Sequence, residues 1–216
     1  MKNNIKYGFV FFLLILFIAC SSDESKSNKK YPQLVSWIES STGDYISTVI
    51  VTKFSSNCNW KPDLPKRRPE ALPIWNNKIP NDTPKNLIDA VSSATPKDVV
   101  EIQINNDLLI DCDTYNIYLE INHSFDYNIS WTKNNSGVNG QPSVLYHANF
   151  IAGQICKEDL SPIGYGSVDG SNGDIIYDVT NITTALDIIK NVYIITNDQN
   201  ELKLTIEPGI YWEDEM

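Results

Sequence analysis

Alternating apolar and polar residues between positions 115 and 132 constrain the fold of this chain more than any other feature. Successive side chains of a β-strand point to opposite faces of the sheet, so a strict period of two predicts strands with one buried face. At about 3.3 Å per residue the stretch is longer than a usual strand. We therefore expect a break between Asn122 and Ser124. The apolar series is Ile117, Leu119, Ile121, His123, Phe125, Tyr127, Ile129 and Trp131.

Further strands are predicted from shorter alternating segments. Residues 143 to 150 alternate with Leu145 and His147 on the outward face. The other segments are 34–39, 45–52, 100–104, 192–196 and 201–206. A capping-box pattern at Thr184 to Asp187 is the one helix signal. We therefore predict an all-β sandwich with one long irregular loop and at most one short helix.

The first 19 residues indicate export. Lys2 and Lys6 precede an apolar run over positions 7 to 19, which is typical of a signal peptide. The run is shorter than the about 20 apolar residues of a membrane-spanning helix. It ends in Phe-Ile-Ala before Cys20, which resembles a bacterial lipobox and implies cleavage before Cys20 and lipidation of its sulfur. The alternative is a secreted protein with a chance cysteine.

Residues 20 to 30 would then be a polar tether. The Ser-Asp-Glu run after Cys20 resembles the export signal of surface lipoproteins in the Bacteroidota, and Ser21 replaces the Asp that usually marks retention in the inner membrane. These resemblances imply a lipid-anchored protein of the bacterial outer membrane. Residues 31–199 are predicted to form the sandwich domain, and residues 200–216 a C-terminal strand and acidic tail.

Charge and cysteine content exclude some classes of partner. A formal charge of -10 disfavours nucleic acid. Two histidines far apart, without metal-ligand spacing, predict no metal site, and the run from Asp169 to Asp174 fits a Gly-rich and Asn-rich turn better than a calcium loop. Cys58, Cys112 and Cys156 allow at most one disulfide within the mature chain, and we expect them to be small core residues.

The long irregular loop is predicted at residues 57 to 84, which hold six of the 11 prolines. Between positions 61 and 85 there are six Lys or Arg against three Asp or Glu. Trp60, Arg67, Arg68 and Trp75 are therefore candidates to bind an anionic ligand or an envelope partner. The alternative is a solvated loop whose tryptophans cover the sandwich core.

No catalytic residue is predicted. His123, Ser124 and Asp126 supply the residue types of a nucleophilic triad. In a strand, however, alternation places His123 on the opposite face from Ser124 and Asp126, so the three side chains would not form a hydrogen-bonded chain.

Four segments resemble a single family. They are RPEALPIW at 68–75, DAVSSATP at 89–96, INHSFDYN at 121–128 and GQPS at 140–143. They are similar, over about residues 31 to 196, to predicted periplasmic proteins of domain-of-unknown-function family 2271. The resemblance implies an Ig-like sandwich akin to that of the flagellar hook-capping protein, in a family with no assigned reaction.

The same resemblance makes Thr95 a candidate cofactor site. Such proteins often occur beside a transferase that attaches flavin mononucleotide to threonine, and residues 89 to 95 resemble its acceptor motif. Ala90 and Ser93 replace the two glycines of that motif, and glycine permits the close approach that the transferase requires. The other interpretation is a structural loop in which Asp89 caps a turn.

These observations lead to three hypotheses. The leading one is a lipid-anchored cell-envelope protein without catalysis or cofactor, acting as an accessory or interaction module. The second is a carrier of covalent flavin mononucleotide at Thr95 in extracytosolic electron transfer. The third is a glycan-binding surface lipoprotein that uses Trp60 and Trp75.

Overall fold

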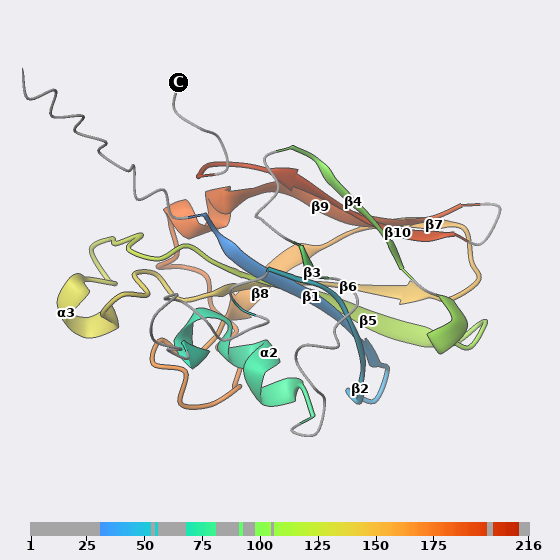
Figure 1. The fold of residues 1–216 in the computed structure, drawn as a ribbon, viewed down its shortest axis with the longest axis horizontal. Coiled ribbons are helices and arrows are strands. Elements are labelled where there is room, and N and C mark those ends of the chain that lie inside the picture. Colours follow the sequence, from blue (N-terminus) through green and yellow to red (C-terminus); the bar gives the residue numbers. More distant parts are fainter. Residues whose placement is uncertain are drawn as a thin grey trace, which may run out of the picture.

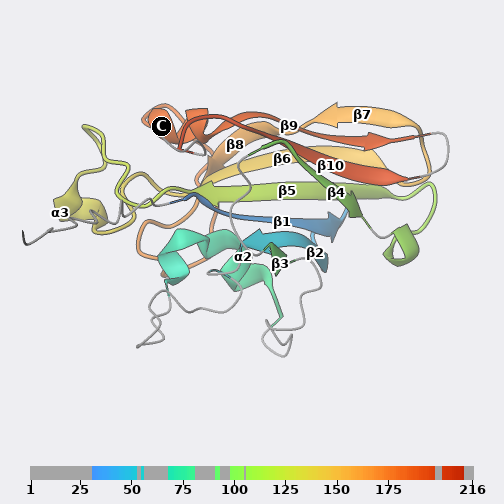
Figure 2. The ribbon, with the colours of Figure 1, turned by 45° about the horizontal axis from the view of Figure 1, so that its top comes forward.

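Two β-sheets pack together as a sandwich (Figures 1 and 2). The computed structural model describes residues 31–52, 55, 68–80, 91–92, 98–104, 106–197 and 201–211. The larger sheet has the strand order β3-β2-β1-β5-β6-β8, and the smaller has the order β4-β10-β9-β7. Neighbouring strands are antiparallel except for the short parallel pair of β2 and β3.

The strands have the following bounds. The larger sheet contains β1 (Gln33–Ser40), β2 (Tyr45–Thr52), β3 (Val91–Ser92), β5 (Thr114–Asn122), β6 (Val144–Ile151) and β8 (Ser161–Tyr165). The smaller sheet contains β4 (Val100–Ile104), β7 (Cys156–Asp159), β9 (Ile189–Thr196) and β10 (Leu202–Pro208).

The main core lies between the sheets. Ile117 and Leu119 of β5 and Ile38 of β1 face Ile194 of β9 and Leu204 of β10, and all five side chains are fully buried. Each buried Ile or Leu contributes about 1.5–3 kcal/mol relative to exposure. The period of two in β5 is therefore the direct cause of its place in the sandwich.

Most of the predicted strands are confirmed. The segments predicted at 34–39, 45–52, 100–104, 143–150, 192–196 and 201–206 are β1, β2, β4, β6, β9 and β10. Because β10 lies between β4 and β9, the sandwich extends past residue 199. Neither β7 nor β8 was predicted, since β7 carries few apolar residues and Pro162 and Gly164 interrupt β8.

The predicted break after Asn122 is confirmed, but no strand follows it. Residues 123 to 132 leave the sheet, and Ile129 is 97% exposed. Phe125 has a φ of 68°, outside the extended region of backbone conformation. The Asn128 side-chain oxygen then accepts hydrogen bonds from the backbone N–H groups of Ser130 and Trp131, which forms an Asx turn.

More short helices are present than predicted. The described residues include α2 (Pro73–Lys78) and α3 (Lys133–Ser136), and three 3₁₀ helices, η1 (Pro69–Ala71), η3 (Asn106–Leu108) and η4 (Thr184–Ile188). The expectation of at most one helix was therefore wrong. The capping box predicted at Thr184 is also absent from η4, because the Thr184 hydroxyl donates to Asp126 instead of capping the helix.

A second core covers the outer face of the larger sheet. Residues 68–80, within the predicted loop, lay η1 and α2 against β1 and β2 (Figure 2). The buried members of this core are Val35, Trp37, Val51, Leu72, Ile74, Trp75, Ile79 and Leu145. The prediction that Leu145 points to solvent is corrected here, since α2 and its neighbours cover that face.

Carboxylates of the sheet hold both ends of α2. At its N-terminus the Glu120 carboxylate accepts hydrogen bonds from the backbone N–H groups of Ile74 at 3.2 Å and Trp75 at 2.9 Å. At its C-terminus Lys78 pairs with the buried Glu39 at 3.1 Å. The positive charge of Lys78 has the sign that the helix dipole favours at a C-terminus. These contacts fix the segment that carries Arg68, one of the predicted binding residues.

Candidate functional site

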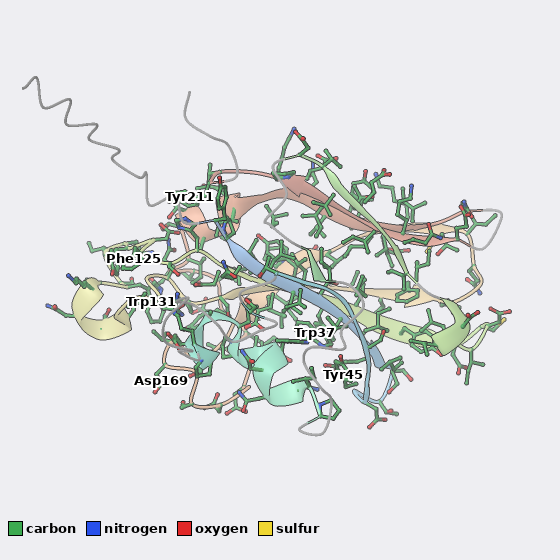
Figure 3. All side chains as sticks on the ribbon, in the orientation of Figure 1. Trp37, Tyr45, Phe125, Trp131, Asp169 and Tyr211 are labelled. Carbon is green, nitrogen blue, oxygen red and sulfur yellow. The ribbon has the colours of Figure 1, made fainter. Side chains whose placement is uncertain are left out.

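One end of the sandwich combines exposed apolar side chains with a loop that is held by buried polar contacts. We define this loop end as residues 123–143, which connect β5 to β6, together with residues 183–184 and 210–211. Figure 3 shows Phe125, Trp131 and Tyr211 gathered at this end. The segments come from distant parts of the chain, so only the folded protein brings them together.

A buried carboxylate lies at the centre of the loop end. The Asp126 side chain is 6% exposed. It accepts hydrogen bonds from Gln141 Nε2 at 2.8 Å, Thr184 Oγ1 at 2.6 Å and the Tyr211 hydroxyl at 3.2 Å. All three donors are neutral. Hydrogen bonds to a charged acceptor are roughly twice as strong as neutral ones, so this cluster ties the three segments together firmly.

Gln141 extends the same network. Its side-chain oxygen accepts from Asn128 Nδ2 at 3.0 Å and from the Thr183 backbone N–H at 2.7 Å. Its backbone N–H donates to the Asp126 carbonyl oxygen at 2.7 Å. Gln141 is itself almost fully buried. The loop is therefore held in place by buried hydrogen bonds rather than by a large apolar core.

Two aromatic residues at this end have strained backbone conformations. Phe125 and Tyr211 both have a φ of 68°, which is uncommon for a bulky residue and costs about 1–3 kcal/mol each. The Phe125 N–H donates to the Val138 carbonyl at 3.0 Å. The Tyr211 ring stacks on His123, with ring centroids 3.9 Å apart. Strain of this kind concentrates at functional sites, where surrounding contacts maintain it.

The outward surface of the loop end is apolar and nearly neutral. Its large exposed side chains are Phe125, Ile129, Val138, Ile210 and Tyr211. Residues 123–143 contain one acidic residue, the buried Asp126, and one basic residue, the exposed Lys133. Residues 123–143 thus present apolar side chains and no exposed carboxylate of their own. Exposed apolar side chains that gather at one surface make it a candidate contact site.

The structure places Trp75 in the second core. Its side chain is 0% exposed, and its indole N–H donates to Thr48 Oγ1 at 3.0 Å. This position corrects the prediction that Trp75 offers a binding surface, and it agrees with the alternative that a tryptophan of the loop covers the sandwich. The hydroxyl of Thr48 also contacts the Tyr45 hydroxyl, so the indole belongs to a packed polar edge of the core.

Arg68 connects the second core to the loop end. Its guanidinium donates to Glu70 at 2.8 Å, to Ser124 Oγ at 2.8 Å and to Asn139 Oδ1 at 3.4 Å. The side chain is 8% exposed, so it acts as an internal brace rather than a receptor for an external anion. The other predicted site residues, Cys20, Trp60, Arg67 and Thr95, lie outside the described residues, as does Cys58.

Ser124 and Asp126, which supply two of the residue types of a triad, have other partners. Asp126 bonds Gln141, Thr184 and Tyr211, and the Ser124 hydroxyl accepts from Arg68. The reason first given against a triad, strand alternation, does not apply because this segment is a loop.

His147 lies on β6, where burial lowers its pKa, and its ring stacks on Tyr118 at 4.7 Å.

The turn around Asp169 binds its own chain. Asp169 Oδ1 accepts from Ser167 Oγ at 2.6 Å and from the Ser171 N–H at 3.0 Å, and these bonds lower the pKa of Asp169 to about 2. Within the described ranges no group of three or more His, Cys, Asp or Glu side chains is placed to hold a metal ion. The Gly-rich and Asn-rich turn predicted at this position is the simpler description.

Of the two described cysteines, Cys156 packs against the main core and Cys112 does not. Cys112 is an exposed free thiol with a φ of 68°, and Cys156 is a half-buried free thiol whose Sγ lies 3.6 Å from Thr196 Oγ1. The prediction of small buried cysteines is therefore wrong for Cys112. The sequence pattern does not reveal Gln141, Thr184 and Tyr211 as partners of Asp126, because residues separated by 15 to 85 positions meet only after folding.

The helices within the described ranges are all too short or too polar to cross a membrane. A scan against protein-family models and searches among curated proteins and solved structures found no match. The resemblance to domain-of-unknown-function family 2271 gains no support from these comparisons and stays a proposal.

Proposed function

We propose that this chain is a non-catalytic interaction module of the bacterial cell envelope, with an Ig-like sandwich anchored through lipid on Cys20 and facing its partner with the loop end. One observation carries the choice of surface. Exposed apolar side chains, including Phe125 and Ile129, sit on a loop that the Asp126 network holds in a fixed conformation. A rigid contact surface loses less conformational entropy on binding than a mobile one.

The position of the surface supports the proposal. In a sandwich, the loops at either end are free to vary while the packed sheets hold them, and Ig-like domains bind partners through such loops. At the loop end, strain at Phe125 and Tyr211 is maintained by hydrogen bonds and stacking rather than relaxed. Contact with a partner explains why the protein keeps these two strained backbone conformations.

The anchor is tested by replacing the lipidated cysteine. Cys20→Ala should move the protein from the membrane fraction to the soluble fraction, and the mass added by the lipid should disappear. Cys112→Ala is the matched control, because Cys112 is an exposed thiol in the folded domain and its loss should leave the protein in the membrane. A Cys20→Ala protein that stays in the membrane would contradict the anchor.

The contact surface is tested with a photo-reactive amino acid in living cells. Placed at Ile129 of the loop end, it should form cross-links to the partner of this surface. Placed at Ile110 of the opposite end, it should form far fewer such cross-links. Ile129 is 97% exposed and Ile110 is 67% exposed, so the two positions are comparable in access. Equal yields at the two positions would argue against the loop end as the contact surface.

A mass measurement separates this proposal from the flavin hypothesis. The purified envelope protein should have the mass of the lipidated chain alone. An additional flavin mononucleotide that disappears in Thr95→Ala would replace the interaction module with an electron carrier.

A further inference from the structure

The chain reaches the sandwich at the loop end. The described residues begin at Tyr31, and β1 starts at Gln33. Gln33 pairs with Asn122, the last residue of β5 and the neighbour of the first residue of the loop. The proposed tether from residue 20 to residue 30 therefore joins the domain beside the loop that begins at His123 and contains Phe125.

The length of the tether favours this end as the one nearer the anchor. Its 11 residues span at most about 40 Å when fully extended. The nine residues of β5 cover about 30 Å. To bring the opposite end to the anchor, the tether would have to run almost fully extended along the strands. The loop end needs no such extension.

The two connections at the ends of β5 differ in charge. At the opposite end, Thr114 of β5 pairs with Ile151 of β6, and the turn before β5 exposes Asp107, Asp111 and Asp113. That end also exposes apolar side chains, namely Leu108, Ile110 and Ile155. The loop between β5 and β6 carries no exposed carboxylate. Of these two connections, only the one far from the tether exposes carboxylates.

From these observations we propose that the loop end rests on the lipid bilayer, with Phe125, Ile129 and Val138 in the interfacial layer. This inference rests on the proposed lipid anchor and names the bilayer as the partner of the loop end. A membrane interface accepts apolar and aromatic side chains, and an acidic surface is repelled by anionic headgroups. The apolar loop between β5 and β6 fits that environment, and the acidic turn before β5 is presented to the surrounding space.

The test uses the lipidated full-length chain in phosphatidylcholine vesicles. Two variants each add one indole, Ile129→Trp at the loop end and Ile110→Trp at the opposite end. Each is measured in ordinary vesicles and in vesicles whose acyl chains carry bromine, which quenches nearby indole fluorescence. Subtraction of the wild-type signal removes the native tryptophans. We expect a loss of the added emission for Ile129→Trp and no loss for Ile110→Trp. Both positions are highly exposed, so neither substitution should disturb folding.

Each other outcome overturns the inference in a distinguishable way. If both variants float with the vesicles and the Ile129→Trp emission is not quenched, the anchor stands and the bilayer is not the partner. Cross-links from Ile129 to a protein in cells would then identify a protein partner. If both added indoles are quenched equally, the domain does not stand on its loop end. If the chain carries no lipid and does not float, the anchor and the inference fail together.

Discussion

Replacement of Glu120 by Gln tests whether a buried carboxylate governs how stability depends on pH. Glu120 is fully buried between β5 and α2. Its carboxylate accepts hydrogen bonds from the backbone N–H groups of Ile74 and Trp75 and from Ser143 Oγ at 2.7 Å. Burial raises the pKa of Glu120 from 4.5 to about 7, and the three hydrogen bonds oppose part of that rise. Gln has nearly the same shape but does not titrate.

The sign and size of the effect follow from this pKa. Between pH 4.5 and about 7 the folded protein holds a proton on Glu120 that the unfolded chain has released. The contribution of Glu120 to stability is therefore fully present below pH 4.5 and is lost as the pH rises through this window. At 1.36 kcal/mol per pH unit the loss amounts to about 3 kcal/mol. In Glu120→Gln this contribution is absent.

The assay is urea unfolding followed by tryptophan fluorescence at several pH values, with the free energy of unfolding obtained by linear extrapolation. The difference in stability between wild type and Glu120→Gln should change by about 3 kcal/mol across the window. Glu101→Gln is the control, because Glu101 forms an exposed pair with Lys203 and should not alter the profile. Parallel profiles for wild type and Glu120→Gln would refute the reasoning.

Further substitutions test the two cores and the loop. Trp75→Ala should lower the free energy of unfolding by about 3–5 kcal/mol because its ring is fully buried, whereas Ile129→Ala should change it by less than about 0.5 kcal/mol; both are measured by urea unfolding. Gly140→Ala should cost clearly more than Gly137→Ala in the same assay. Both glycines have positive φ, but a Cβ at Gly140 would lie 2.6 Å from the Asp126 backbone, while one at Gly137 meets nothing within 4 Å. Equal losses for the two glycines would contradict the close packing beneath the loop.

The pattern that predicts β5 also explains why the prediction fails beyond it. Apolar residues continue at every second position through Trp131, but a strand also needs a partner. β6 begins at Val144, opposite Ile121, so residues 123–131 have no paired strand on that side. The alternation records which residues are apolar and contains no information about pairing. Phe125 and Ile129 are therefore exposed, although the period of two predicts that they are buried.

A signal for the second core was present in the sequence. Apolar residues occupy both faces of β1 and β2, for example Leu34 with Val35 and Ile50 with Val51. Strands with nearly continuous apolar runs are covered on both faces. Residues 68–80 supply that cover, so Trp75 has a structural role. By contrast, the sequence holds no local signal for the Asp126 network, because its members come from three distant segments.

Hydrogen exchange measured in native membranes tests the central claim most directly. The backbone amides of the loop between β5 and β6 are compared in membrane-bound wild type and in soluble Cys20→Ala protein. We expect exchange between Phe125 and Val138 to be slower on the membrane, and exchange at Leu108 and Ile110 to be unchanged. If the loop amides exchange equally fast in both preparations, the loop end contacts nothing in the envelope, and the proposed interaction surface is wrong.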